Sequence, residues 1–553
     1  MSEHQSRRQF MAGAGAFGAA TVLAPQALAA QLSGKRRAPT LRGGQFREGV
    51  LSGDPSPSAI TLWTRVAGVG GRGSVELEVA RDRGFRRVVA RELIPTSSRI
   101  DHSVKARVKG LKPYEQYYYR FSTRGNDSPV GRFRTALPPD SHQPVRFAFF
   151  SCQDFTFGYY NAHALLADED IDFVVNLGDY IYAEAYHSAG SVSGGVRTDP
   201  IGESRTLAQY RDKYALYRSD ANLRRMHAKF PMISIWDDHE VQDNYAGGAG
   251  ADGGLAKQLG YSRAREKAGY RAYFESMPTF AVPPSRGTRI YRAARFGRNV
   301  DLVLLASRQY RADQPCDDEF VGPPCADLND SRPFLGRTQM NYVKSRLRRS
   351  PAAWKVIANQ VMVMKTIYPG GDYIGFDSWQ GYPRERHELL DYIRTRKIDD
   401  VVFITGDIHT FIAGDVRIGD DDRIPVATEV RGRLDHLTGA WRRRRRCGAR
   451  GRSAQPPHPG QHPRPAAQGK PMGQGRRCRP PRLCRRRGSS YWPALQLQAG
   501  GHDEEAQQGR ACAEAVCLPP WQGAEGHPVG LRRCRAGGRC GRRAARRCRA
   551  SCA

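Results

Sequence analysis

The chain has 553 residues, enough for about two to four domains with substantial hydrophobic cores. Its net charge of +32 would point to a polyanion partner if it were spread over the chain, but residues 431–553 hold 28 Lys and Arg residues against 6 Asp and Glu residues. Because most of the positive charge lies in this C-terminal segment, the net charge does not indicate a basic polyanion-binding surface on the first 430 residues. We expect no specific nucleic-acid partner.

The N-terminus has the pattern of an export signal. Arg7 and Arg8 form a twin-arginine pair, residues 12–24 are apolar but too few to span a bilayer permanently, and Ala27-Leu28-Ala29 fits a small-residue cleavage site. We predict a removed signal peptide over residues 1–29 that engages the twin-arginine translocation machinery; the alternative is a chance arginine pair before an Ala-rich helix. No later stretch is apolar enough for a stable membrane span, so the expected location is periplasmic or secreted.

Residues 44–137 are predicted to form a β-sandwich. Alternating apolar runs at 60–66, 75–79 and 117–121 are separated by turns rich in Gly, Pro, Asp and Ser. Leu111-Lys112-Pro113, followed by the run at 117–121, resembles the late strand region of fibronectin type III domains. This part of the chain shows no cluster of titratable groups, so we interpret it as a packing or substrate-shaping module.

Residues 142–430 are predicted to form an α/β domain. The apolar runs 147–150 and 173–177 are strand-like, and a helix-compatible segment lies between them, so together they form a βαβ unit. Catalytic groups in such units lie just past the carboxyl ends of the strands. Each side chain at these ends has an ordinary structural explanation when taken alone, but together they are a thiol, a carboxylate and a phenol: Cys152, Asp179 and Tyr182.

Two further strand ends carry acidic and imidazole side chains. The run 231–236, which follows a predicted helix at 207–226, ends in Asp237-Asp238-His239-Glu240 with Asn244 beyond, and adjacent carboxylates repel unless a cation neutralises them. The run 401–405 leads directly into Gly406-Asp407-Ile408-His409. Strands are also predicted at 302–305 and at 354–360, which contains Asn359.

The side chains at these strand ends are of two chemical kinds. Carboxylate and amide oxygens suit Ca²⁺, Mg²⁺ or Mn²⁺, whereas thiolate, phenolate and imidazole suit iron or another transition metal. A two-metal centre bridged by one carboxylate would account for both kinds. Such a centre binds the oxygens of a phosphate ester and activates a water for in-line attack, so the residues predict phosphate-ester hydrolysis.

Three motifs in this order resemble those of the calcineurin-like metallophosphoesterases. They are Gly178-Asp179-x-x-Tyr182, then Asp237-Asp238-His239-Glu240 where relatives have Gly-Asn-His-Glu, then Gly406-Asp407-Ile408-His409 where relatives have Gly-His-x-His. With Cys152, the preceding β-module and the twin-arginine pattern, the chain looks specifically like PhoD-type alkaline phosphatases over about residues 44–430. The resemblance implies a metallophosphoesterase domain of αββα architecture after a fibronectin-III-like β-sandwich.

The resemblance also implies roles for individual residues. It implies that Fe³⁺ is held by Cys152, Asp179, Tyr182 and either His409 or Asp407, and that Asp179 bridges to Ca²⁺, which Asp238 and Asp407 help to bind; other divalent metals are compatible. The division of Asp407 and His409 between the two metals stays open. His239 would lie against the phosphate or leaving-group oxygen, with Asn244 as a further metal ligand and Asn359 as a further catalytic candidate.

Two functional classes follow. The first is a secreted, metal-dependent phosphatase that acts on monoesters, diesters or both, in small molecules or polymers, and releases phosphate by attack of a metal-activated water. The alternative is a non-catalytic, cation-stabilised envelope protein that binds surface polyanions. A binding protein has no need of a thiol and several carboxylates at neighbouring strand ends, and this favours the enzyme.

Two features before residue 430 are of separate interest. The stretch 304–311 looks like the family's Asp-x-Arg-x-Tyr-Arg segment, but Ala306 replaces the usual Asp and removes a polar contact. Cys316 and Cys325 are nine residues apart and are predicted to form a disulfide in an oxidising compartment; the alternative is two accessible thiols.

Residues 431–553 are dense in Arg, Pro, Gly and Cys and lack helical or strand periodicity, which is typical of a disordered tail. A second interpretation is a shifted reading frame. Dropping one base from the codons of residues 430–438 permits Phe-Val-Gly-Gly-Ser-Ile-Thr-Ser, and the same shift permits Asn-Pro-Trp-Val-Lys from 470–475 and His-Gly-Tyr-Ala from 481–484. These resemble the ends of PhoD-type chains, so we predict out-of-frame translation after about residue 429 and a poorly folded or inactive product.

Overall fold

The computed structural model describes residues 38–185, 195–250, 260–280, 289–368 and 370–432, together with the backbone of residues 495–497. The predicted signal peptide and nearly all of the tail lie outside these residues. Within the described ranges, none of the helices combines the length and the apolar character that crossing a bilayer requires.

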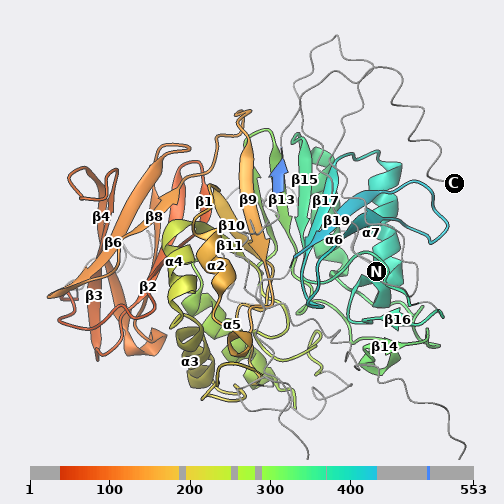
Figure 1. Cartoon of the computed structure of the whole chain (residues 1–553), viewed down its shortest axis with the longest axis horizontal. Coiled ribbons are helices and arrows are strands. Elements are labelled where there is room, and N and C mark those ends of the chain that lie inside the picture. The colour runs from red at the N-terminus through yellow and green to blue at the C-terminus, as the bar shows by residue number, and fades with distance from the viewer. Residues whose placement is uncertain are drawn as a thin grey trace, which may run out of the picture. The chain divides into compact units, whose positions relative to one another are not determined.

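Two β-sheets form the centre of the fold (Figure 1). The first has seven strands in the order β20 (Leu495–Leu497), β9 (Val145–Phe150), β10 (Phe173–Asn176), β11 (Pro231–Ser234), β1 (Val50–Ser56), β2 (Ala59–Arg65) and β5 (Ser103–Lys109). The second has six in the order β12 (Arg292–Phe296), β13 (Val300–Leu304), β15 (Trp354–Ala358), β17 (Val401–Thr405), β19 (Ala427–Arg431) and β18 (Ile412–Val416). Strands β9, β10 and β11 run parallel, as do β13, β15, β17 and β19.

Side-chain alternation along β13 shows how the layers pack. Leu302 and Leu304 belong to the same buried cluster as Phe147 and Val175 of the first sheet, whereas Val303 belongs to a second cluster on the opposite face. That second cluster contains residues of α6 (Gly336–Arg349) and α7 (Pro383–Thr395), which cover the outer face of the six-stranded sheet in Figure 1. The first cluster also contains residues of α3 (Leu207–Tyr217), α4 (Ala221–Lys229) and α5 (Arg263–Ser276). The αββα architecture is therefore confirmed.

The N-terminal β-sandwich is also confirmed, but it shares a sheet with the domain that follows. Its second sheet consists of β4 (Val88–Ser97), β3 (Arg72–Ala80), β6 (Gln116–Thr123), β7 (Asn126–Asp127) and β8 (Gly131–Arg134). This sheet packs on β1, β2 and β5 through a common buried cluster. Because β1 pairs in parallel with β11, the strands β1, β2 and β5 extend the seven-stranded sheet rather than forming a separate module.

The helix predicted at 207–226 is divided into α3 and α4. The first helix ends at Tyr217, and Asp220 caps the second, because its side chain accepts hydrogen bonds from the backbone N–H groups of Asn222 and Leu223. The remaining elements of the α/β domain are short: α2 (Asn161–Leu166), β14 (Val321–Gly322) and β16 (Tyr373–Ile374). Strands β14 and β16 pair with each other, away from both central sheets.

Candidate active site

The carboxyl ends of the parallel strands carry the predicted site residues, and the fold brings most of them together. Cys152 follows β9, Asp179 and Tyr182 follow β10, Asp237 to Asn244 follow β11, and Asp407 and His409 follow β17. The first three strands belong to one sheet and the fourth belongs to the other, so the site lies where the strand ends of the two sheets meet.

The first cluster of possible metal ligands combines sulfur, oxygen and nitrogen. One ligand atom each from Cys152, Asp179 and His409 lies within 4.8 Å of the others. The Sγ of Cys152 is 3.3 Å from Oδ2 of Asp179, and the hydroxyl of Tyr182 is 2.9 Å from Nε2 of His409. Cys152, Asp179 and Tyr182 are buried. This donor set has the soft and intermediate ligands that suit a transition metal.

Two further clusters are dominated by carboxylates, and one of them shares Asp179 with the first. Asp179 also groups with Asp238 and His239, and Asp238 groups with Asp237 and Asp407, again within 4.8 Å. Asp179 is therefore common to the mixed cluster and to an oxygen-rich one, as expected for a bridging carboxylate. Its Oδ1 atom is buried and has no hydrogen-bond partner, so it is available to a cation.

The backbone of the candidate ligands is unusual. The φ angles of Cys152, Asp179, Asn244, Asp407 and His409 are 56°, 52°, 52°, 78° and 52°, all in the left-handed region that L-residues seldom adopt. Such conformations persist only where the surrounding structure imposes them, and they concentrate at functional sites.

Gly178 lets two of the ligand loops approach each other. Its φ is 115°, and a Cβ atom added there would lie 2.4 Å from Cβ of Asp237 and 2.6 Å from the Asp237 backbone nitrogen. Only glycine fits a position that combines positive φ with so close a neighbour. In the Gly-Asp pair of the motif, the glycine therefore allows the close approach of the two loops, and the aspartate supplies the carboxylate.

Glu240 holds the same two loops together, a role that was not predicted from the sequence. Its carboxylate accepts hydrogen bonds from the backbone N–H groups of Asp179 (3.1 Å), Tyr180 (2.7 Å) and Asp237 (2.8 Å). Burial raises the pKa of Glu240 to about 8, although these N–H donors act in the opposite direction. The buried last residue of the Asp-Asp-His-Glu motif thus positions the loops that carry Asp179 and Asp237.

Glu184 orients His239 and was also missed. Its Oε2 atom is 2.8 Å from Nδ1 of His239, and the imidazole stacks on Tyr182 with ring centroids 4.0 Å apart. The backbone N–H of Asp243 donates to Oε1 of Glu184 at 3.0 Å. Burial alone would lower the pKa of His239, but Asp238, Asp179 and Glu184 outweigh it and raise the pKa well above its usual range. These contacts leave Nε2 on the side of Asp238, 3.8 Å from its Oδ2.

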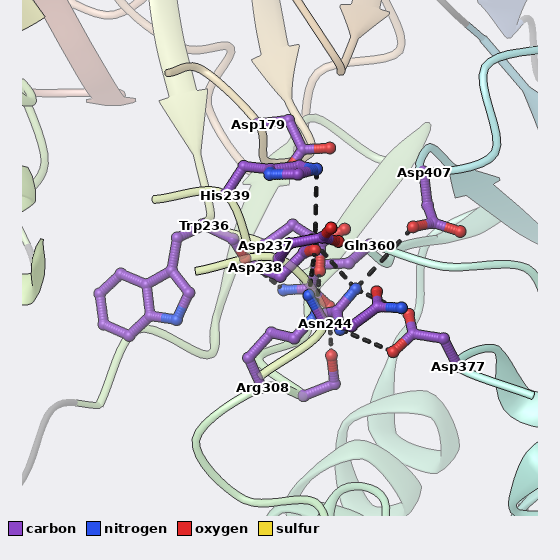
Figure 2. A network of polar contacts seen from close by, with 12 residues as sticks. Asp179, Trp236, Asp237, Asp238, His239, Asn244, Arg308, Gln360, Asp377 and Asp407 are labelled. Carbon is purple, nitrogen blue, oxygen red and sulfur yellow. Dashed lines mark hydrogen bonds and ion pairs between the residues drawn. The ribbon is translucent and has the colours of Figure 1, made fainter. Parts of the chain in front are cut away.

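Arg308, in the segment that follows β13, is the third residue that sequence reasoning missed. Figure 2 shows its side chain reaching into the carboxylates of Asp237, Asp238, Asp377 and Asp407. Its Nη1 and Nη2 atoms donate to the two oxygens of Asp377 at 2.7 and 2.8 Å, and Nε donates to Asp237. The family-like stretch 304–311 was the signal available in the sequence, but it does not say where the guanidinium group points.

The carboxyl groups differ in their electrostatic environment. Burial, reinforced by Asp238, raises the pKa of Asp179 well above its usual range, and burial with Asp377 and Asp237 does the same for Asp407. Burial would also raise the pKa of Asp238, but Arg308 and His239 outweigh it and lower the pKa. Buried anionic oxygens at this density favour a bound cation, which fits the donor sets described above.

The remaining sequence predictions have separate outcomes. Asn244 donates through its backbone N–H to Oδ2 of Asp238 at 2.7 Å, and its Nδ2 is 3.2 Å from Asp318. Asn359 lies at the end of β15, where its Nδ2 donates to the carbonyl of Val361, so its part in the site stays a prediction. Cys316 and Cys325 form the predicted disulfide.

The family-atypical Ala306 is fully buried. Its backbone N–H donates to the side chain of Gln339 at 2.9 Å, and its carbonyl accepts from the same side chain at 2.7 Å. The segment that leads to Arg308 is thus fixed by α6 through its backbone, without a carboxylate at position 306.

Known proteins resemble the chain over both of its parts. The family model described as "PhoD-like phosphatase" matches residues 147–434, and the model described as "PhoD-like phosphatase, N-terminal domain" matches residues 31–137. Alkaline phosphatase D of Bacillus subtilis (strain 168) is 36% identical over 425 residues, which cover 74% of this chain and 72% of the relative. A solved structure of a protein named PhoD is 35% identical and superposes with a TM-score of 0.67, covering 72% of this chain and 78% of the other.

Proposed function

Because this chain belongs to the PhoD-like phosphatase family, we propose that it is a secreted, metal-dependent phosphatase that hydrolyses phosphate monoesters, diesters or both. The observation that supports metal dependence most strongly is the position of Asp179. It belongs both to the cluster with Cys152 and His409 and to the cluster with Asp238 and His239, and one of its buried oxygens has no hydrogen-bond partner.

We propose that Fe³⁺ is held by Cys152, Asp179, Tyr182 and His409, and that Ca²⁺ is held by Asp179, Asp238, Asn244 and Asp407. The thiolate, the phenolate and the carboxylate carry one negative charge each, so together they balance the charge of Fe³⁺. The oxygen donors of the second set suit calcium. When bound, such metals supply Lewis acidity at phosphate oxygens and activation of a water.

His239 is the residue placed to donate a proton. Its Nδ1 lies 2.8 Å from Glu184, which fixes the ring and favours a proton on Nδ1, while Nε2 faces the acidic cluster. The carboxylates around the ring favour the imidazolium form, which carries a second proton on Nε2. We propose that Nε2 donates this proton to the leaving-group oxygen as the ester bond breaks.

Replacing Glu184 with glutamine is expected to slow hydrolysis about tenfold to a hundredfold, because the partner that orients His239 loses its charge. The loss should be larger for an alkyl phosphate than for p-nitrophenyl phosphate, since a poor leaving group depends more on protonation. Steady-state kinetics on both substrates measure this. Glu203→Gln is the matched control, because Glu203 also accepts from Arg265 but is more exposed. An equal loss on both substrates would argue against the proton-donor role.

Chelation tests the proposed function itself. The purified protein should hydrolyse p-nitrophenyl phosphate or bis(p-nitrophenyl) phosphate, lose that activity after removal of metals, and regain it when calcium and iron are returned. The ratio of the two substrates reports the preference for monoesters or diesters. Full activity after exhaustive chelation would exclude the metal-dependent mechanism. Binding of surface polyanions without turnover, the alternative from the sequence, is not favoured by the family.

The proposed function also includes an export signal at the N-terminus and an altered C-terminal region. We propose that residues 1–29 direct export through the twin-arginine pathway to the periplasm or the medium, and that the sequence after about residue 429 is out of frame. The family match ends at residue 434, close to the proposed break. Arg431 supports the break, because it is buried at the end of β19 where the shifted frame would place valine.

A further inference from the structure

Arg218 is a buried arginine that connects the N-terminal β-sandwich to the loop that follows β10. It lies directly after α3, and its side chain is fully buried. Its Nη1 atom donates to Oε2 of Glu48 at 3.2 Å, and its Nε atom donates to the hydroxyl of Tyr180 at 3.1 Å. Glu48 shortly precedes β1 of the sandwich, whereas Tyr180 follows Asp179 in the chain. One guanidinium group therefore contacts both parts of the protein.

The sandwich fixes its end of this connection. Arg65, the last residue of β2, donates from Nη1 to Oε1 of Glu48 at 3.0 Å. The same guanidinium group makes a bidentate contact to Asp101, at 2.7 and 2.9 Å. The ring of Trp63, also in β2, has its centre 4.4 Å from Cζ of Arg218. Because a buried charge needs such partners, the sandwich holds the Arg218 side chain through an ion pair and through a ring face.

The end of α3 supports the loop after β10 at two consecutive residues. The phenol oxygen of Tyr217 accepts a hydrogen bond from the backbone N–H of Tyr182 at 2.9 Å, and the next residue, Arg218, binds the side chain of Tyr180. The Tyr180 hydroxyl also lies 2.7 Å from Nε2 of His227 in α4. The loop is therefore held at its backbone and through a buried side chain.

The conformation of this loop depends on such support. Asp179 has a φ of 52°, which is unfavourable for a residue with a side chain and persists only where the neighbouring structure imposes it. Tyr180 is fully buried, so its anchored ring fixes the residue directly after Asp179. If this anchor were lost, the loop would relax toward an ordinary backbone conformation, and the carboxylate of Asp179 would move.

We propose that Arg218 is a positioning residue through which the N-terminal β-sandwich holds Asp179 in its catalytic geometry. The inference rests on the function proposed above, and it gives the sandwich a role in turnover in addition to packing. A purely structural contact would affect only the stability of the protein. A positioning contact also affects kcat in molecules that are still folded.

Kinetics well below the melting temperature test this inference, in the chain with the restored frame and with calcium and iron supplied. Tyr180→Phe removes the hydroxyl that Arg218 binds and is expected to lower kcat about tenfold, with KM changed less than about twofold. Glu48→Gln should lower kcat about threefold to tenfold. The double variant should be no slower than Tyr180→Phe alone, because Glu48 acts through Arg218 on the hydroxyl that this variant has already lost.

Arg211→Gln is the matched control. Arg211 also lies on α3, makes a bidentate contact to Glu275 at 2.7 and 3.0 Å, and donates to the carbonyl of Arg99 in the sandwich. These contacts join α3 to α5 and to the sandwich, not to the loop after β10. Any loss in Arg211→Gln should therefore appear in the melting temperature and not in kcat.

Hydrogen exchange measures the order of the loop without turnover. The backbone amides of residues 179–182 should exchange faster in Tyr180→Phe and Glu48→Gln than in the wild type, and at the wild-type rate in Arg211→Gln. Wild-type kcat or wild-type exchange in Tyr180→Phe, or additive losses in the double variant, would overturn the inference. A wild-type protein without phosphatase activity would overturn the proposed function instead, and the exchange rates would still decide the inference.

Discussion

Replacing Asp179 with asparagine is expected to reduce hydrolysis of a chromogenic phosphate ester by about 10³-fold or more, which corresponds to roughly 4 kcal/mol of lost transition-state stabilisation. The physical reason is that Asp179 belongs both to the cluster with Cys152 and His409 and to the cluster with Asp238 and His239, so the change would weaken two proposed metal sites at once. The amide keeps the size of the side chain, and the backbone N–H of Asp179 can still donate to Glu240. The measurement is kcat/KM in the chain with the restored frame, with calcium and iron supplied.

The control for Asp179→Asn is Asp415→Asn, which changes an exposed carboxylate on β18 that pairs with Arg417. It should retain wild-type kcat/KM, because surface ion pairs contribute little and this one is outside the site. Circular dichroism and the melting temperature establish that both variants are folded. If the Asp179→Asn variant kept at least half of the wild-type activity, the shared carboxylate would not be required for the mechanism.

Restoring the reading frame after about residue 429 is expected to turn a poorly soluble, inactive chain into a folded phosphatase. The change replaces the buried Arg431 with valine, and removing a buried arginine from a strand end should contribute roughly 3 kcal/mol to stability. It also supplies a β-prone continuation of the six-stranded sheet in place of an Arg-rich tail. Gly432, which lies against Phe149, is a glycine in both frames.

Soluble yield, melting temperature and specific activity of the two forms measure this effect. Sequencing the coding DNA around codon 430 tests the origin of the tail independently. An unbroken frame, together with peptides from the Arg-rich region in a mass spectrum, would refute the frameshift. Equal solubility and equal activity of the two forms would show that the C-terminal region does not limit folding.

Much of the fold could be predicted from local sequence patterns. The apolar runs at 147–150, 173–177 and 401–405 correspond to β9, β10 and β17, because buried parallel strands have continuous apolar sequences with polar ends. The single helix predicted at 207–226 was wrong in its continuity, since the apolar period does not show that Asp220 caps a new helix. Strand β1 was also missed, because its sequence is rich in the turn-type residues Ser, Gly, Asp and Pro and has no apolar alternation. Its pairing with β11 was missed too, because a strand pattern does not show which strand lies beside it.

Some residues of the candidate site could be predicted from the sequence, and others could not. Cys152, Asp179, Asp238 and His409 could be identified because each follows a recognisable strand or motif, and the structure brings them together. Glu184 and Asp377 could not, since neither belongs to a recognised motif and each acts through a partner 55 or 69 residues away in the chain. Contacts of that kind depend on loop geometry, which hydrophobic periodicity does not predict.

The measurement that tests the central claim most directly is the metal content of the frame-restored protein, purified without chelator, beside its Asp179→Asn variant. Elemental analysis should find iron and calcium in the wild type, each near one equivalent per chain, and a marked loss of both in the variant, because one carboxylate serves both sites. A wild-type protein that hydrolyses phosphate esters with neither metal bound, or a variant that retains both, would contradict the shared metal centre.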